Sequence, residues 1–456
     1  MKVIGKLKFV SFENIESWSA YNILEKGLTF SNRYKLVKIK SFLSRNKTPI
    51  KIEENTYYKR PTIKINGGGV FLRDEVKGEK IGTKNQFLIR GGQFLLSKID
   101  ARNGAFGVVP EGLDRGIITG NFWTFDVDYN LINPYFLQLI TRTKQFQNLS
   151  QSASVGTTNR NYLQEESFLN FHIPLPSISK QEAIVKNYYG KIEQAVAWEQ
   201  EADTIEKSIE TYLFKSLRIK QETEERTKKK GLQFVEFHKM DFWGVDKIKL
   251  DEGIHSLQYE VISIGDFPGL LVTCFRGKSP KYTETSSKFI LNQKCNRWNS
   301  IDFSFVKSVD EDWYNNIDGD LFTKEGDILV NSTGEGTIGR ATYITKDYDG
   351  LIYDSHILLL RLNKSIYNPI LFVELFNSSY IQTQIDKIKS AQATKQTELG
   401  INNLLKIRIP ILHNLQMQQA IIDQIDTYKN EIKVLREKAK KLKQQAEQEF
   451  EQMIFS

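Results

Sequence analysis

The sequence predicts an α+β protein in which two repeated mixed α/β units are separated by two long helices that form an antiparallel coiled coil, with quasi-twofold symmetry. Three observations lead to this fold class: an internal repeat, short strand-like runs broken by turn residues in each half, and a heptad pattern that ends each half. The chain has 456 residues, of which 40% are hydrophobic and 12% aromatic, so it can bury a sizeable core and is globular in composition.

The repeat runs through both halves of the chain in the same order. Phe9-Val10-Ser11-Phe12 recurs as Phe234-Val235-Glu236-Phe237, at an offset of 225 residues. Further matches, with small drifts in offset, pair Tyr34-Lys35-Leu36-Val37 with Tyr259-Glu260-Val261-Ile262, Arg45-Asn46-Lys47-Thr48-Pro49 with Arg276-Gly277-Lys278-Ser279-Pro280, Gly92-Gln93-Phe94-Leu95 with Gly326-Asp327-Ile328-Leu329, Gly104-Ala105-Phe106-Gly107 with Gly336-Thr337-Ile338-Gly339, Asn133-Pro134 with Asn368-Pro369, and Ile173-Pro174 with Ile409-Pro410. This order indicates one unit that has been duplicated.

Each repeated unit combines short strands with helices. Residues 122–127 and 357–362 are strand-like runs bounded by Gly, Asn and Pro turns. A helix is expected after each Asn-Pro, over residues 134–147 and 369–389, because proline is favoured at the first helical position.

A long helix is expected at the end of each half, after a cap at Ser179 in the first copy. The chain therefore divides into a unit at residues 1–177, a helix at 178–230, a second unit at 231–412 and a second helix at 413–456. Apolar residues step by three and four along both helices, so each needs a partner helix, and the other copy is the economical one. The predicted seam consists of Ala195, Trp198, Ala202, Ile205, Ile209, Tyr212, Ile421, Ile425, Tyr428, Ile432, Leu435, Ala439, Leu442 and Ala446.

The positive charge is concentrated in one segment. The chain carries a formal net charge of +8, and the four segments in chain order contribute +10, +1, −3 and 0. A basic surface that attracts nucleic acid is therefore expected on the first unit. For the second unit the net charge does not predict such a surface. No apolar run approaches the ~18 residues of a membrane span, so we expect a cytoplasmic protein without membrane contact.

Several motifs suggest catalysis but are incomplete. Asn133-Pro134-Tyr135-Phe136 lacks the second proline of the loop with which amino-methyltransferases hold their target base, so it is interpreted as a helix start. Residues 334–340 resemble a phosphate-binding loop, but Arg340 stands in place of its lysine. The five histidines are scattered, and two cysteines cannot build a zinc site. We expect no catalytic residue, no metal and no cofactor in this chain.

The repeat, the glycine motifs and the junctions before the helices resemble the specificity subunit of Type I restriction-modification systems. The most specific junctions are Ile173-Pro174-Leu175-Pro176 before Gln181-Glu182-Ala183-Ile184, and Ile409-Pro410 before Gln418-Gln419-Ala420-Ile421. The resemblance covers almost the whole chain. It implies two target recognition domains held by a coiled-coil ruler, with no chemistry of their own.

The resemblance also implies the partners. Such a subunit reads a split double-stranded DNA sequence and recruits methyltransferase subunits, expected to be two, which use S-adenosylmethionine. It leaves open whether a restriction subunit that uses ATP and Mg²⁺ joins the complex. A coiled-coil assembly protein whose globular ends bind other proteins is the alternative that the residues leave open.

The predicted DNA contacts are basic, amide and aromatic side chains in repeat-matched turns. Arg and Lys suit guanine edges, Asn suits adenine, and cations neutralise phosphates. In the first unit these are Arg45, Lys47, Lys51, Tyr57, Tyr58, Lys59, Arg60, Lys98, Arg102, Asn103, Asn159 and Arg160. In the second they are Arg276, Lys278, Lys281, Lys294, Arg297, Asn331, Arg340 and Lys395.

Overall fold

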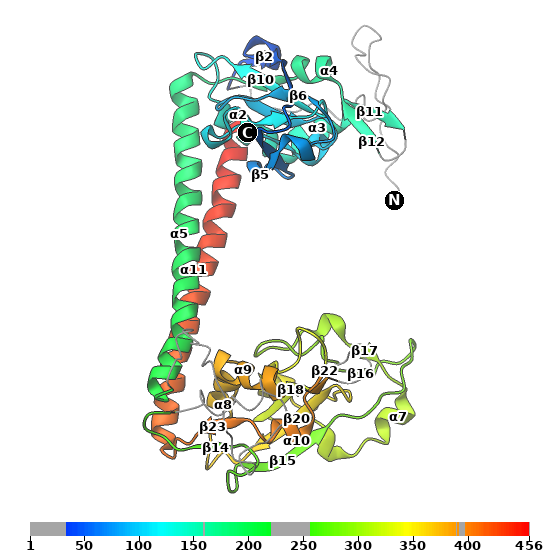
Figure 1. Cartoon of the computed structure of the whole chain (residues 1–456), viewed down its shortest axis with the longest axis vertical. Helices are drawn as coiled ribbons and strands as arrows, with labels where there is room; N and C mark the ends of the chain where they lie inside the picture. The colour runs from blue at the N-terminus through cyan, green and yellow to red at the C-terminus, as the bar shows by residue number, and fades with distance from the viewer. Residues whose placement is uncertain (1–32, 158–159, 220–255, 389, 392–396, 456) are drawn as a thin grey trace, which may run out of the picture. The chain divides into compact units, whose positions relative to one another are not determined.

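The computed structural model describes residues 33–157, 160–219, 256–388, 390–391 and 397–455 (Figure 1). The chain forms two compact units, one from residues 1–199 with 437–456 and the other from residues 200–436. These units do not coincide with the four segments expected from the sequence, because each unit contains part of both long helices. The two units are described separately.

The first unit is built around a four-stranded antiparallel sheet with the order β2-β10-β7-β8. These strands are β2 (Leu43–Asn46), β10 (Phe122–Val127), β7 (Phe94–Ser97) and β8 (Phe106–Val108). The first and last strands of the unit, β1 (Leu36–Lys38) and β13 (His172–Pro174), pair with each other. Helices α2 (Pro134–Arg142), α3 (Lys144–Ser152) and α4 (Glu165–Asn170) share the core of buried aromatic side chains with this sheet.

Further strands surround this core in the first unit. A long two-stranded ribbon and a three-stranded sheet lie between β2 and β10 in the sequence, and a hairpin follows α3. They are β4 (Tyr57–Lys64) with β5 (Gly69–Lys77), β3 (Thr48–Lys51) with β6 (Asn85–Leu88) and β9 (Ile117–Ile118), and β11 (Ser154–Thr157) with β12 (Arg160–Leu163).

The second unit repeats the central topology of the first. Its four-stranded sheet has the order β15-β20-β18-β19, and β14 pairs with β23 as β1 pairs with β13. These strands are β15 (Leu271–Arg276), β20 (Ile357–Leu362), β18 (Asp327–Asn331), β19 (Ala341–Tyr343), β14 (Val261–Ser263) and β23 (Arg408–Pro410). The remaining elements are β16 (Phe289–Ile290), β17 (Lys307–Ser308), β21 (Ser390–Ala391), β22 (Thr397–Glu398), α7 (Glu311–Asn315), α8 (Pro369–Phe376), α9 (Ser379–Ile388) and α10 (Ile401–Leu404). The identical strand order confirms the duplication expected from the sequence.

The helices expected over residues 134–147 and 369–389 are each broken into two. In the first unit the break falls at Thr143, whose backbone is extended (φ −65°, ψ 146°) and whose hydroxyl accepts a hydrogen bond from the Phe146 N–H at 3.3 Å. A threonine that caps a new helix competes with continuation of the old one. The proline positions were correct, since Asn133 and Asn368 cap α2 and α8 directly before Pro134 and Pro369.

The long helices α5 (Ile178–Ser216) and α11 (Leu415–Phe455) pair antiparallel, as expected. In the first unit Lys191 forms an ion pair with Glu449, and Lys443 donates to Glu199 at 2.7 Å. In the second unit Arg436 donates to Asp203 and Glu206 at 3.0 and 2.7 Å. Residue numbers that rise along α5 pair with residue numbers that fall along α11, so the two helices run antiparallel. Helix α5 begins at Ile178, so Ser179 lies inside the helix and the prediction that it is the cap was wrong.

The predicted seam residues lie inside the helix pair or against the unit cores. Those that are buried are Ala195, Ala202, Ile421, Ile425, Ile432, Leu435, Ala439 and Ala446. Those that are half-buried are Trp198, Ile205, Ile209, Tyr212, Tyr428 and Leu442. The rings of Tyr212 and Tyr428 meet edge to face with centroids 5.8 Å apart. The spacing of three and four therefore corresponds to a continuous contact stripe within each unit.

A fully buried glutamine fastens each long helix to its unit. Gln181 accepts a hydrogen bond from the Asn133 N–H at 2.8 Å and donates to the carbonyls of Leu131 (3.0 Å) and Pro176 (2.9 Å). In the second unit Gln418 accepts from the Asn368 N–H at 2.6 Å and donates to the carbonyls of Ile366 and Leu412 at 3.1 and 2.6 Å. The glutamine of each junction thus joins the start of the helix to the Asn-Pro turn.

The strand registers correct the sequence alignment of the glycine motifs. Phe106 and Ala341 occupy equivalent positions in β8 and β19. Gly104, two residues before Phe106, therefore corresponds to Gly339, and both have positive φ, at 76° and 80°. The sequence match with Gly336 was wrong by three residues, because Gly104 and Gly107 have the same spacing as Gly336 and Gly339 and only the strand register shows which glycines are equivalent.

The same registers separate arginines that the sequence had paired. Arg45 lies opposite Phe125, and Cys274 lies opposite the equivalent residue Leu360, so Arg45 corresponds to Cys274 and not to Arg276. Equivalent surfaces of the two units therefore carry different side chains.

Candidate nucleic-acid interface

Three predicted contacts of the first unit are engaged within the unit. Arg45 donates to the carbonyls of Asn46 and Thr124 at 3.0 and 2.9 Å, and its guanidinium lies over the rings of Trp123 and Phe125. Arg60 binds Asp74 through two hydrogen bonds of 2.7 and 2.8 Å. Lys59 donates to the Gly112 carbonyl at 2.9 Å. These geometries assign the three cations to holding strands and turns together.

Of these three cations, Arg45 has the most contacts within its unit. Burial lowers the pKa of its guanidinium, while Glu165, 3.5 Å from its Nε, opposes that shift. A half-buried cation with one carboxylate and two aromatic rings around it has little capacity left for an outside partner.

Other predicted contacts of the first unit reach solvent. Lys47, Lys51 and Asn103 are exposed, and Tyr57 is 63% exposed, whereas Tyr58 is buried with its hydroxyl on the Glu53 N–H. Arg102 is half-buried on the single turn Ala101–Asn103, and Lys98 lies 5.4 Å from the Tyr162 ring centroid. Asn159 lies outside the described residues, as does the side chain of Arg160.

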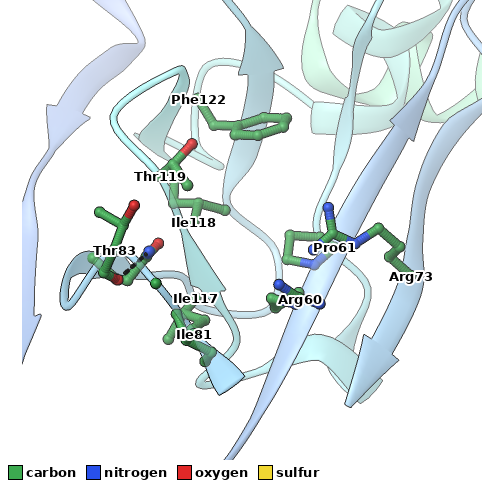
Figure 2. A pocket seen from close by; sticks show the side chains of 11 residues that line it. Arg60, Pro61, Arg73, Ile81, Thr83, Ile117, Ile118, Thr119 and Phe122 are labelled. Atoms are coloured by element: carbon green, nitrogen blue, oxygen red, sulfur yellow. Dashed lines mark hydrogen bonds between the residues drawn. The ribbon is translucent and has the colours of Figure 1, made fainter. Parts of the chain in front are cut away.

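A pocket of about 220 Å³ lies between the β4–β5 ribbon and the β3-β6-β9 sheet (Figure 2). Arg60 and Arg73 line one side, and Ile117, Ile118 and Phe122 form an apolar wall. Both arginines contact the carboxylate of Asp74, so half of the positive charge on this side is already balanced. The pocket has the size for a small group, but it has no concentrated charge.

In the second unit three of the predicted cations are paired with acids. Arg276 forms an ion pair with Glu398 at 2.5 Å, Lys281 with Asp310 at 3.0 Å, and Arg297 with Asp302 at 3.3 Å. Lys278 and Lys294 are exposed. Lys395 lies outside the described residues.

The prediction that Asn331 contacts DNA is wrong, because this side chain is completely buried. Its amide donates to the carbonyls of Gln293 and Thr337 at 2.9 and 3.1 Å, and its oxygen accepts from Asn296 at 3.0 Å. Asparagine is an adenine-reading residue by type, but here it satisfies backbone groups behind the surface.

A surface of aromatic and basic side chains lies directly in front of this buried amide pair. The Arg340 guanidinium lies 5.8 Å from the centroid of the Trp298 ring, and the Arg297 guanidinium lies 4.9 Å from the centroid of the Phe305 ring. Trp298 is 49% exposed and Phe305 39%. Sequence reasoning found the arginines and missed Trp298, although a tryptophan between Arg297 and Asn299 in a polar turn is an unusual feature that could have been noticed.

The positive charge of the second unit is local. Residues 281–307 hold five Lys or Arg against two Asp or Glu, although residues 231–412 together are slightly acidic. Every exposed aromatic side chain in the described part of the second unit also falls within residues 282–305. This segment therefore combines the basic and aromatic features expected of a DNA-binding surface.

The described residues contain no group of three or more His, Cys, Asp or Glu placed to hold a metal ion. Burial raises the pKa of the Cys274 thiol to about 11, which leaves it a poor nucleophile. No described helix is both long enough and apolar enough to cross a membrane.

Comparison with known families is informative for both halves of the chain. The sequence model of the Type I restriction modification DNA specificity domain matches residues 32–188 and 283–444. The chain belongs to this family of DNA specificity domains. The two matched ranges include the central sheet of the first unit, strands β18, β19 and β20 of the second, the start of α5 and most of α11, which agrees with the resemblance noted in the sequence. No match was found among proteins with curated functions.

Three solved structures are similar to this chain at low sequence identity, and the first of them shares its fold. A chain from work on complex assembly and conformational transition of the type I R-M system is 14% identical, with a TM-score of 0.58 over 93% of this chain and 98% of that chain. The HsdS subunit from Thermoanaerobacter tengcongensis is 14% identical, with a TM-score of 0.47 over 93% and 97% of the two chains. The S subunit from M. genitalium is also 14% identical, with a TM-score of 0.42 over 91% and 97%.

Proposed function

We propose that this chain is a non-catalytic subunit that reads a bipartite, gapped DNA target, with one half-site for each unit. The observation that carries the proposal is the duplicated sheet topology, β2-β10-β7-β8 and β15-β20-β18-β19, joined by an antiparallel helix pair. Two binding modules of the same architecture on one chain suit a target with two separate parts.

Charge supports DNA as the ligand of each unit. Residues 1–177 carry a net charge of +10, and Lys47, Lys51 and Asn103 are exposed. In the second unit the basic and aromatic segment 281–307 provides the equivalent attraction. Because Arg340 corresponds to Ala105 and not to Arg102, the two units should read different half-site sequences.

The partners in this proposal are methyltransferase subunits, two for a duplicated chain. They would supply the S-adenosylmethionine chemistry, and a restriction subunit that uses ATP and Mg²⁺ would be a further partner. Support comes from the family and from the 0.58 TM-score neighbour, which was described in the context of type I R-M complex assembly.

The test is to co-express the chain with its methyltransferase partner and to sequence the modified bases of the host DNA. The expected result is a motif of two short half-sites separated by unspecified bases, with one modified adenine in each half. Arg102→Ala and Arg340→Ala should relax specificity in different halves. An ungapped motif would refute the bipartite proposal.

Salt dependence separates this function from that of a protein-binding adaptor. Each phosphate contact that is removed should lower the slope of log K against log salt by about 0.9. Lys47→Ala should therefore reduce the slope by about one, whereas Lys441→Ala on the exposed side of α11 should leave it unchanged. An adaptor would show no binding to duplex DNA and no such slope.

A further inference from the structure

A tight turn in the second unit, residues 296–301, carries an exposed tryptophan at its tip. Asn296 and Ile301 form a bridge across the turn, and the Arg297 N–H donates to the Ser300 carbonyl at 2.9 Å. Asn299 follows Trp298 in the left-handed region, at φ 53°. The tip of the turn is therefore Trp298, whose ring is 49% exposed.

The turn is held from below by hydrogen bonds to the sheet. Asn296 is fully buried and donates to Asn331 Oδ1 at 3.0 Å and to the Arg340 carbonyl at 3.1 Å. The buried Thr342 hydroxyl lies within hydrogen-bond distance of the Arg297 and Ser300 carbonyls, at 3.0 and 3.2 Å. Such anchoring means that little conformational entropy remains to be lost when the exposed tip binds a partner.

One guanidinium group lies over the exposed ring and a second lies over a neighbouring ring. Arg340 lies over Trp298 and Arg297 lies over Phe305, and the proximity of Arg297 adds to burial in lowering the pKa of Arg340. Asp302 balances only one of these two cations. The turn therefore presents an apolar plane beside positive charges, which complements a stacked base and its phosphates.

We propose that Trp298 inserts into a base step of the half-site bound by the second unit and unstacks it, with Arg297 on a flanking phosphate and Arg340 beside the unstacked bases. This inference rests on the proposed DNA-reading function. Apolar side chains that wedge between base pairs unstack the step and bend the duplex, and bases stack well on aromatic rings. Asn331, predicted as a contact, then acts as a positioning residue beneath the wedge.

The test uses the complex of the full chain with its methyltransferase partner, without S-adenosylmethionine. Duplexes carrying the gapped motif have 2-aminopurine at each position in turn, apart from the methylated adenines. We expect a fluorescence rise at one step in the presence of the wild-type complex. Trp298→Ala should abolish that rise and weaken binding about tenfold or more, and Trp298→Phe should retain most of both.

Val272→Ala is the matched control, because this apolar side chain is 63% exposed in the same unit and lies outside segment 281–307. It should leave fluorescence and affinity unchanged. The proposal is overturned if Trp298→Ala binds like the wild type, if no position brightens, or if the variant loses its methyltransferase partner, which would make this face a protein contact. Failure of the wild-type complex to bind any gapped duplex would refute the underlying function as well.

Discussion

Replacement of Gln181 by methionine should destabilise the first unit locally. Methionine has a similar length and shape, so the change removes three hydrogen bonds without opening a large cavity. The variant leaves the Asn133 N–H and the carbonyls of Leu131 and Pro176 without their side-chain partner in a buried place. Gln418→Met provides the same perturbation in the second unit.

The expected cost follows from these contacts. Each buried polar group left unsatisfied costs about 1–3 kcal/mol, and carbonyls tolerate this better than N–H groups. One N–H and two carbonyls together give about 3–5 kcal/mol. A loss of this size is a large part of the stability of a typical domain.

Hydrogen exchange measured by mass spectrometry is the suitable assay, because a two-unit chain does not unfold in a single step. In Gln181→Met the peptides covering residues 131–137 and the start of α5 should exchange faster, while those of the second unit keep wild-type rates. Gln418→Met should show the converse. Gln194→Met and Gln444→Met, at exposed sites on the same helices, are the matched controls. A change of less than ~0.5 kcal/mol in both buried variants, the usual range for surface substitutions, would refute the reasoning.

Three further predictions concern packing and ion pairs. Phe450→Ala should destabilise the first unit by about 3–5 kcal/mol, measured by exchange in that unit, since the ring is buried in its core. Arg361→Met should destabilise the second unit by about 3–5 kcal/mol, because it leaves the buried Asp327 carboxylate without its ion-pair partner. Adding Asp327→Asn should recover part of this loss in a double-mutant cycle. Lys191 donates a hydrogen bond that holds the pKa of Glu449 below its ordinary 4.5, so this contribution is present above pH 4.5 and fades as the pH falls through the lower folded value. Acid titration of helix content should show that fading in the wild type and not in Glu449→Gln.

The duplication and the helix pair could be predicted because they rest on order and periodicity, which survive local change. The breaks at Thr143 and after Phe376 could not, since the Thr143 hydroxyl that caps α3 and the Ser378 hydroxyl that donates to the Leu375 carbonyl belong to residues that look like any other polar residue inside a helical pattern. The alignment error at Gly104 has the same origin. Two loops of different length contain several glycines, and only the strand register identifies which of them are equivalent.

The candidate site was predicted by residue type, and type does not determine exposure. Arg45 and Asn331 have the donors that DNA reading needs, but both use these donors in hydrogen bonds to carbonyls inside their own units. Arg297 and Arg340 were found by the same reasoning and lie at the surface beside aromatic rings. Trp298 was missed because an isolated tryptophan suggests a core, and only its place at the tip of a turn distinguishes it.

The split of each long helix between the units has a consequence for protein synthesis. Residues 437–456 complete the core of the first unit, where Phe450 meets Phe136 and Tyr188 edge to face. The ribosome makes this stretch only after all of residues 200–436. The second unit can therefore complete its core while the first unit still exposes apolar side chains to solvent. The half of the protein that is made first is therefore the last to finish folding.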